Sequence, residues 1–290
     1  MPVPGPLVST QWLADHLGGE NLVVLDATVL SVEGGGHVAG DEEYLVYGHV
    51  PGAYSADLIE QFSDPEARFS FTRPGREQFE RVAGEHGISN DSTVIVYDTA
   101  SGQWASRLWW LLRTFGHDDV AVLDGGLTRW RQEERELETG YTAPVARTFV
   151  AVEREGLWAD KQEVEEVAAG RRSGALVCAV PAKEFSGEAP VRRRAGHISG
   201  SLSVPAGSLV DRETRRWLGA EALAERLAPV VHGERVIVYC AAGIAATSGA
   251  LALTLLGHPD VAVYDGSLNE WSADPDAPLI VVESDSPTAA

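Results

Sequence analysis

The sequence predicts an α/β fold made of two tandem domains, each a doubly wound, mostly parallel sheet flanked by helices. Three observations lead to this prediction. The chain has 290 residues, about twice the ~150 residues of a common domain. It contains an internal repeat, and short apolar runs alternate with helical segments inside each copy. Parallel strands buried on both faces have this apolar character, and helices between them produce a doubly wound sheet.

The repeat relates the two halves of the chain. Residues 48–53 (GHVPGA) return as 196–201 (GHISGS), and residues 94–98 (VIVYD) return as 236–240 (VIVYC). A longer match, FGHDDVAVLDG, returns as LGHPDVAVYDG before a tryptophan in each copy. The order is kept and each copy is as long as a whole domain, which excludes a solenoid of short units.

Each copy supplies its own strands and helices in the same order. In the first copy we expect strands at 22–25, 94–97 and 120–123, and a helix over 106–115 that Gly116 ends. In the second, we expect strands at 236–239 and 261–264 and a helix over about 243–256. The boundaries that follow are a first domain at 1–140, a linker at 141–157 and a second domain at 158–290, since TGYTAP at 139–144 interrupts any helix.

Composition excludes several classes of partner. The chain has 43 acidic and 23 basic side chains, for a net charge of −20. Such a charge repels nucleic acid and anionic membrane surfaces. We see no signal peptide and no apolar run of membrane-spanning length. Two cysteines in the whole chain are typical of reduced thiols, so we expect a cytoplasmic protein.

Cys240 lies where a buried strand ends and a helix begins, the place at which doubly wound sheets bind their ligands. The loop after it is made mostly of small side chains: Ala241, Ala242, Gly243, Ile244, Ala245 and Ala246. Small side chains let the backbone amides turn toward the sulfur, and such a nest at a helix N-terminus stabilises a thiolate. Gly243 permits the bend. Asp98, the counterpart of Cys240, has no such loop, so one copy carries the nucleophile and the other is non-catalytic.

Together these segments, with SRLWW at 106–110, RTFG at 113–116 and YDGS at 264–267, resemble the tandem rhodanese-domain sulfurtransferases. The resemblance extends over nearly the whole chain. It implies a non-catalytic N-terminal rhodanese-like domain, a catalytic C-terminal one and a site at their interface. It also implies that Cys240 takes a sulfane sulfur from thiosulfate or 3-mercaptopyruvate, becomes a persulfide, and gives the sulfur to cyanide, a thiol or thioredoxin.

The family pattern favours one donor and leaves the proton relay incomplete. Thiosulfate enzymes tend to place a cation after the cysteine, whereas the neutral Ala241-Ala242-Gly243 is more similar to mercaptopyruvate enzymes. Those enzymes carry a hydroxyl where Ala242 stands. The resemblance makes His49 and the upstream Asp41 candidate acid–base groups, but without that hydroxyl their link to the cysteine would be broken.

The anionic group of the donor needs a cation, and the family's positions do not supply one. Val180 stands where the family has an arginine, and Glu184 where some mercaptopyruvate enzymes have a substrate arginine. We therefore expect Arg192 or Arg194, from the run 192–194, to bind the donor, with Glu184 nearby. Trp104 matches an aromatic that the family projects toward the cysteine. Cys178, at a strand end, is expected to be buried and inert, and Trp109, Trp110 and Trp130 are expected to be core residues.

Two other functions compete with this one. Phosphatases of related architecture need an arginine six residues after the cysteine, where this chain has Ala246. A sulfur carrier or protein-binding module with little catalysis remains the alternative, because Val180, Ala242 and Ala245 weaken the pattern. No metal site and no nucleotide cofactor are expected, since the histidines lack zinc-ligand spacing and no phosphate-binding glycine loop is present.

Overall fold

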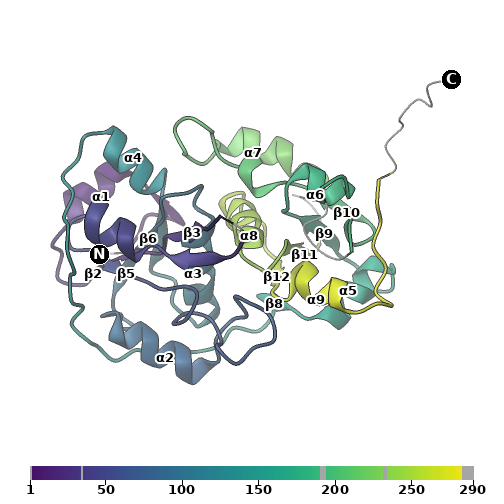
Figure 1. Ribbon diagram of the computed structural model, residues 1–290, viewed down its shortest axis with the longest axis horizontal. Coiled ribbons are helices and arrows are strands. Elements are labelled where there is room, and N and C mark those ends of the chain that lie inside the picture. The colour runs from purple at the N-terminus through teal and green to yellow at the C-terminus, as the bar shows by residue number, and fades with distance from the viewer. Residues whose placement is uncertain (1, 34, 190–193, 231–233, 283–290) are drawn as a thin grey trace.

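The computed structural model describes residues 2–33, 35–189, 194–230 and 234–282. It consists of two α/β halves that lie side by side, with helices α3 and α8 facing each other between them (Figure 1).

The first half is built on a five-stranded parallel sheet in the order β1-β7-β6-β2-β5. Its strands are β1 (Leu7–Val8), β2 (Leu22–Asp26), β5 (Tyr54–Ser55), β6 (Thr93–Tyr97) and β7 (Val120–Leu123). A small antiparallel pair joins β3 (Val29–Ser31) to β4 (His37–Ala39). The helical elements are α1 (Thr10–His16), the π-helix Glu43–Tyr47, α2 (Arg76–Glu85), α3 (Gln103–Thr114) and α4 (Gly126–Gln132).

The second half repeats this arrangement. Its sheet has the order β10-β9-β11-β12-β8, again parallel throughout. Its strands are β8 (Trp158–Ala159), β9 (Ala175–Cys178), β10 (Ser201–Ser203), β11 (Val236–Tyr239) and β12 (Val261–Tyr264). The helices are α5 (Lys161–Ala168), α6 (Ala182–Ser186), the 3-10 helix Ala206–Ser208, α7 (Ala220–Arg226), α8 (Ala245–Leu255) and α9 (Ser267–Ala273).

Starting at β8, the second sheet has the order β8-β12-β11-β9-β10. This corresponds strand for strand to the order β1-β7-β6-β2-β5 of the first sheet. The predicted fold is therefore confirmed, because both halves are doubly wound parallel sheets with one topology. The middle strands β6 and β11 carry VIVY and are buried along their whole length, as expected for strands covered on both faces. Cys178, which pairs with Tyr239, is fully buried, as predicted.

The two central helices begin at different points from those predicted. Helix α3 begins at Gln103 rather than Ser106, because the carboxylate of Asp98 accepts the first free amides of the helix and stabilises an earlier turn. Helix α8 begins at Ala245 rather than Gly243, because Gly243 has a φ of +75° and is not helical.

Residues 133–157 connect the halves and run along the first one. The amide of Arg147 donates to the Gly84 carbonyl, and that of Arg154 to the Thr114 carbonyl. The boundaries predicted at residues 140 and 158 stay a prediction. Trp109, Trp110 and Trp130 are buried, as predicted. None of the helices within the described residues is long and apolar enough to cross a bilayer.

Candidate functional site

The hydroxyl of one serine, Ser267, fixes the loop that follows β11. Cys240 is the first residue of this loop, and its amide donates to the hydroxyl oxygen of Ser267 at 3.1 Å. The same oxygen accepts the amide of Gly243 at 3.1 Å and donates to the Tyr264 carbonyl at 2.7 Å. Ser267 is fully buried and has a φ of +48°. One hydroxyl therefore sets both the beginning and the bend of the loop.

Gly243 makes the bend possible, as the sequence indicated. Its φ is +75°, and a Cβ at this position would lie 2.7 Å from the Asp265 carbonyl oxygen. Any other side chain would push the loop away from β12.

The first half of the molecule holds the loop from the other side through Arg107. This side chain on α3 is 1% exposed. Its Nη1 atom donates to the Gly243 carbonyl at 3.2 Å and to Asp265 Oδ1 at 2.7 Å, and Nη2 donates to the Phe71 carbonyl at 2.6 Å. The second carboxylate oxygen of Asp265 accepts the amide of Arg73 at 2.8 Å. The position of the cysteine loop thus depends on both halves.

Several backbone amides at the start of α8 are unpaired, as the predicted nest requires. Within the described residues, the amides of Ala242, Ile244 and Ala246 have no hydrogen-bond acceptor. Helix α8 has no side-chain cap either. Unpaired amides at a helix N-terminus carry partial positive charge and attract an anion.

The first half shows what such a nest binds. Asp98 follows β6 as Cys240 follows β11, and α3 begins at the same spacing after it. The Asp98 carboxylate accepts the amides of Ala100 and Gly102 on one oxygen and of Trp104 and Ala105 on the other, at 2.9–3.0 Å. Burial raises the pKa of Asp98, and the four amides oppose that effect by stabilising the charged form. A built-in carboxyl group therefore occupies the first nest.

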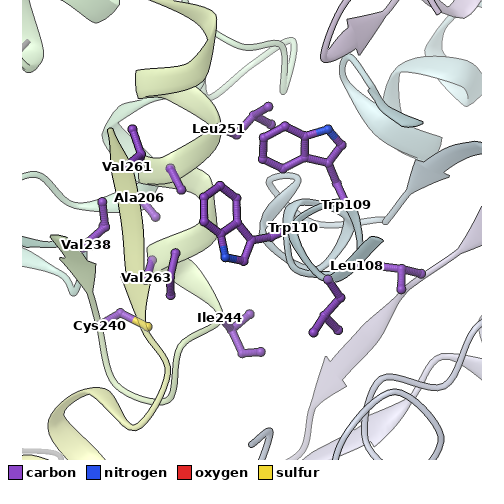
Figure 2. Packing of buried hydrophobic residues seen from close by; sticks show 14 of the residues in the cluster. Leu108, Trp109, Trp110, Ala206, Val238, Cys240, Ile244, Leu251, Val261 and Val263 are labelled. Atoms are coloured by element: carbon purple, nitrogen blue, oxygen red, sulfur yellow. The ribbon is translucent and has the colours of Figure 1, made fainter. Parts of the chain in front are cut away.

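Cys240 itself is almost completely covered. Its exposed fraction is 2%, and Figure 2 shows it at the end of β11, with Ile244 at the far end of the loop and Trp110 of α3 directed toward the second half. Only a small group has room at this sulfur.

A cleft between the two halves reaches this loop. It has a volume of about 920 Å³. Ala179, which follows β9, and Ala245, at the start of α8, line it, and Ser101 and Gln103 contribute from the first half. Three arginines line it as well: Arg212, Arg215 and Arg226. Cys240 does not line the cleft directly, so a ligand there would meet the loop at Ala245.

Several predicted site residues lie elsewhere. His49 is fully buried in the first half, where its ring stacks on Tyr44 and its Nδ1 atom lies 2.9 Å from the Tyr44 carbonyl oxygen. Asp41 accepts the hydroxyl of Ser55. In the part of the chain that the structure describes, no hydrogen bond connects either side chain to Cys240. The predicted acid–base pair is therefore not brought together with the cysteine.

The predicted anion contacts need correction too. Arg194 donates to the carbonyls of Asp274 and Ala277, so its guanidinium holds the segment after α9. Arg192 lies outside the described residues. Glu184 is in α6 and does not line the cleft. The reason for the difference is that Arg194 already has carbonyl partners within its own half.

Trp104 is buried between Phe71 and His37, with ring centroids 5.3 and 5.4 Å away. It packs at the base of the Asp98 nest and does not line the cleft. Its predicted contact with the donor is therefore absent from the described cleft, because the ring turns into the core of the first half.

Sequence reasoning missed two groups of residues. The first group is Arg107, Asp265 and Ser267. These residues belong to the motifs SRLWW and YDGS, which indicated the family but were given no role in the site. One signal was available, because the second copy has Asp-Gly-Ser where the first has Asp-Gly-Gly. The second group is the three cleft arginines, of which two belong to the conspicuous run DRETRR at 211–216.

Comparison with known proteins gives one family for both halves. The model of the rhodanese-like domain matches residues 9–133 and 164–274. A 3-mercaptopyruvate sulfurtransferase from Escherichia coli is 34% identical over 282 residues, covering 94% of this chain and 96% of that protein. A thiosulfate sulfurtransferase from Rattus norvegicus is 34% identical over 281 residues, covering 91% of each.

Solved structures agree with this. The crystal structure of SseA, a 3-mercaptopyruvate sulfotransferase from Escherichia coli, superposes with a TM-score of 0.81 at 30% identity, over 91% of this chain and 98% of that one. The Tum1 protein from Saccharomyces cerevisiae has the same TM-score over 96% and 99% of the two chains at 21% identity, which shows the fold alone.

Proposed function

Because the chain belongs to the family of rhodanese-like domain proteins, we propose that it is a sulfurtransferase whose nucleophile is Cys240. The relatives carry the two activities expected from the sequence, transfer from 3-mercaptopyruvate and from thiosulfate. The observation that carries the assignment to Cys240 is the nest of unpaired amides around it, whose counterpart in the first half binds the carboxylate of Asp98.

The reaction takes two steps. In the first, the Cys240 thiolate attacks the transferable sulfur of the donor and forms an S–S bond. The bond between that sulfur and the rest of the donor breaks, releasing sulfite from thiosulfate or, after protonation of the leaving carbon, pyruvate from 3-mercaptopyruvate. In the second, a nucleophilic acceptor such as cyanide or a thiol takes the outer sulfur and the thiolate is restored.

The nest stabilises the charge in both steps. A thiolate and a persulfide are both anions, and the unpaired amides of Ala242, Ile244 and Ala246 are free to donate to either. The loop residues Ala241 and Ala245 complete the backbone path and carry no charge. This neutral loop favours 3-mercaptopyruvate over thiosulfate, whose two negative charges would need a cation beside the sulfur.

The proposal also assigns different roles to the two halves. Residues 1–140 form the non-catalytic domain, 141–157 the linker and 158–290 the catalytic domain. Asp98 supports this division because its carboxylate fills the first nest, leaving no place for a donor. We also propose a cytoplasmic location, since both cysteines are free, and include thioredoxin among the acceptors to be tested.

The test is turnover with each donor and cyanide as acceptor, followed by the formation of thiocyanate. We expect activity with 3-mercaptopyruvate to exceed that with thiosulfate, and Cys240→Ser to abolish both. Mass spectrometry after donor alone should find the mass of one sulfur atom added at Cys240. Cys178→Ser is the matched control, because that thiol is buried at the end of β9. Background turnover and no added sulfur would overturn the assignment.

A protein that carries sulfur without efficient turnover is the second candidate. The coverage of Cys240, at 2% exposed, favours it to the extent that acceptors cannot reach the sulfur. It predicts one equivalent of added sulfur at Cys240 but no sustained formation of thiocyanate, so the same two measurements distinguish it from the enzyme.

A further inference from the structure

One wall of the interdomain cleft carries three arginines that the two-step reaction does not use. Arg212 and Arg215 belong to residues 211–216, which we call the arginine loop, and Arg226 is the last residue of α7. All three line the same cleft as Ala179 and Ala245. Within the described residues, none of the three forms an ion pair with a carboxylate.

The cleft is cationic in a strongly acidic chain. The protein has a net charge of −20, yet among the residues that the structure describes Asp211 is the single acidic side chain lining this cavity. Its carboxylate accepts the amides of Glu213 and Thr214 and so serves the arginine loop itself. A local reversal of sign in a concave site concentrates small anions there.

The arginine loop is fixed from across the cleft. Arg216 Nε donates to Asp124 Oδ2 at 2.8 Å, and the Trp217 amide donates to Asp124 Oδ1 at 2.8 Å. A bridge between Val210 and Trp217 closes the base of the loop. Asp124 belongs to the first half, so the first half fixes the C-terminal end of the loop, while Arg212 and Arg215 line the cleft.

The backbone at Arg215 is strained, and the strained residue is one whose side chain lines the cleft. Its φ is +60°, in the left-handed region that side chains with a Cβ occupy at a cost. A glycine would relieve this cost but would remove the guanidinium from the cleft wall. Strain of this kind gathers at functional sites.

We propose, on the premise that Cys240 transfers sulfur as described above, that Arg212, Arg215 and Arg226 bind the carboxylate of the sulfur donor. Guanidinium groups bind carboxylates bidentately and keep their charge at any physiological pH. These three side chains take the role that the sequence assigned to Arg192 and Arg194. Val180 is buried and supplies no cation.

The placement of the arginines selects a class of donor. They lie on the cleft wall, whereas the cysteine loop meets the cavity only at Ala245. A suitable donor therefore has its anionic group at one end and its sulfur at the other, as in a small mercapto-carboxylate. Thiosulfate, whose charge lies one bond from the transferred sulfur, reaches the loop without spanning to the arginines.

Steady-state kinetics of the 290-residue chain test the proposed carboxylate site of Arg212, Arg215 and Arg226, which we call the clamp. For Arg212→Gln, Arg215→Gln and Arg226→Gln we expect the KM for 3-mercaptopyruvate to rise about 10-fold each, the effect of losing one charge-assisted contact. The kcat should change by less than about threefold, because the arginines do not touch the reacting sulfur. The control is Arg171→Gln, an exposed arginine in the second half without an ion pair among the described residues, which should leave KM unchanged.

The variant Arg215→Gly should change stability and donor binding in opposite directions, which distinguishes a binding role of Arg215 from a structural one. Removing the strain should raise the melting temperature, and losing the guanidinium should raise KM. A residue with only a structural role would not move the two quantities in these directions. Unchanged KM in all three glutamine variants would overturn the proposal.

Binding of pyruvate distinguishes failure of the clamp from failure of the proposed function. Calorimetric titration of pyruvate into Cys240→Ser measures the carboxylate site without any transfer of sulfur. If the wild-type protein transfers no sulfur but Arg215→Gln in the Cys240→Ser background weakens pyruvate binding about 10-fold, the clamp stands and the sulfurtransferase assignment falls. If the wild type turns over and pyruvate binds equally with and without Arg215, the clamp falls alone.

Discussion

The guanidinium of Arg107, in the first half of the molecule, donates to the carboxylate of Asp265, in the second half, over 2.7 Å. The repeat contains the reciprocal contact. Asp124 has the place in the first half that Asp265 has in the second, directly after β7 and β12 respectively, and it accepts Arg216 from the second half. Each carboxylate also accepts one backbone amide from the opposite half. The halves therefore exchange equivalent contacts, and one of these exchanges holds the Cys240 loop through Gly243.

Removing the Arg107 side chain should disturb stability and activity together. Arg107 is 1% exposed and Asp265 is 13% exposed, and breaking a buried pair leaves one charge without a partner. We expect Arg107→Gln to lower the free energy of unfolding by about 3 kcal/mol and kcat/KM by more than about 10-fold, since the Gly243 carbonyl loses its donor. Urea unfolding and donor kinetics measure both.

The matched control is Arg81→Gln, which removes an exposed pair between Arg81 and Glu85 within one helix. Its effect on the free energy of unfolding should stay within about 0.5 kcal/mol. A double-mutant cycle of Arg107→Gln with Asp265→Asn should show coupling, because the two side chains share one hydrogen bond. Additive effects would show that the pair does not act as a unit.

Asp98 should matter for folding and little for chemistry. Asp98→Ala leaves four amides of the first nest without an acceptor, which we expect to cost about 3 kcal/mol of unfolding free energy. Asp98→Asn keeps one acceptor oxygen and should cost less. Turnover of the folded variants at Cys240 should stay within about twofold of the wild type. A tenfold loss of turnover in folded Asp98→Asn would give the first half a catalytic role.

The sequence was sufficient for the parts of the molecule that local patterns determine. The repeat, the buried VIVY strands and the strand–loop–helix position of Cys240 are each visible in a short stretch of chain. They predicted a doubly wound parallel sheet in each half, a loop of small residues between Cys240 and the next helix, and the need for glycine at position 243. These features follow from backbone geometry and side-chain size, which sequence spacing specifies.

What the sequence could not predict depends on tertiary contacts, some within one half and some between the halves. Nothing near Arg194 indicates that carbonyls after α9 occupy its guanidinium. Nothing near Arg212 indicates that Asp124, far away in the chain, fixes the loop on which it lies. His49 was chosen for its chemistry, but the fold uses it as a stacked core residue. Residue type and order do not reveal which partner a side chain meets in the folded protein.

Ser267 should control the shape of the cysteine loop. Its hydroxyl accepts the amides of Cys240 and Gly243, so Ser267→Ala leaves two buried amides unpaired. We expect kcat/KM for either donor to fall about 10-fold and the free energy of unfolding to fall by about 2 kcal/mol. Ser267→Gly fits the positive φ better, so it should recover stability relative to alanine without recovering activity. Equal activity of all three proteins would show that the hydroxyl does not position the loop.

Asp26 should make the stability of the protein depend on pH. It lies at the end of β2, and burial raises its pKa from 3.8 to about 6, although hydrogen bonds from Thr28 oppose this shift. In the unfolded chain the carboxyl loses its proton near 3.8, whereas the folded protein keeps it until about pH 6. The contribution to stability is therefore complete below about pH 4 and is lost as the pH rises through 6, a change of about 3 kcal/mol.

Asp26→Asn removes this dependence because an amide stays neutral and its oxygen can still accept both bonds from Thr28. The difference in unfolding free energy between the variant and the wild type should be close to zero at pH 4 and should grow to about 3 kcal/mol in favour of the variant at pH 7.5. Denaturant titrations at several pH values measure it, with the exposed Asp91→Asn as the control that should show no such trend. A difference that stays constant with pH would mean that Asp26 is ionised in the folded protein throughout this range, with its charge stabilised by Thr28.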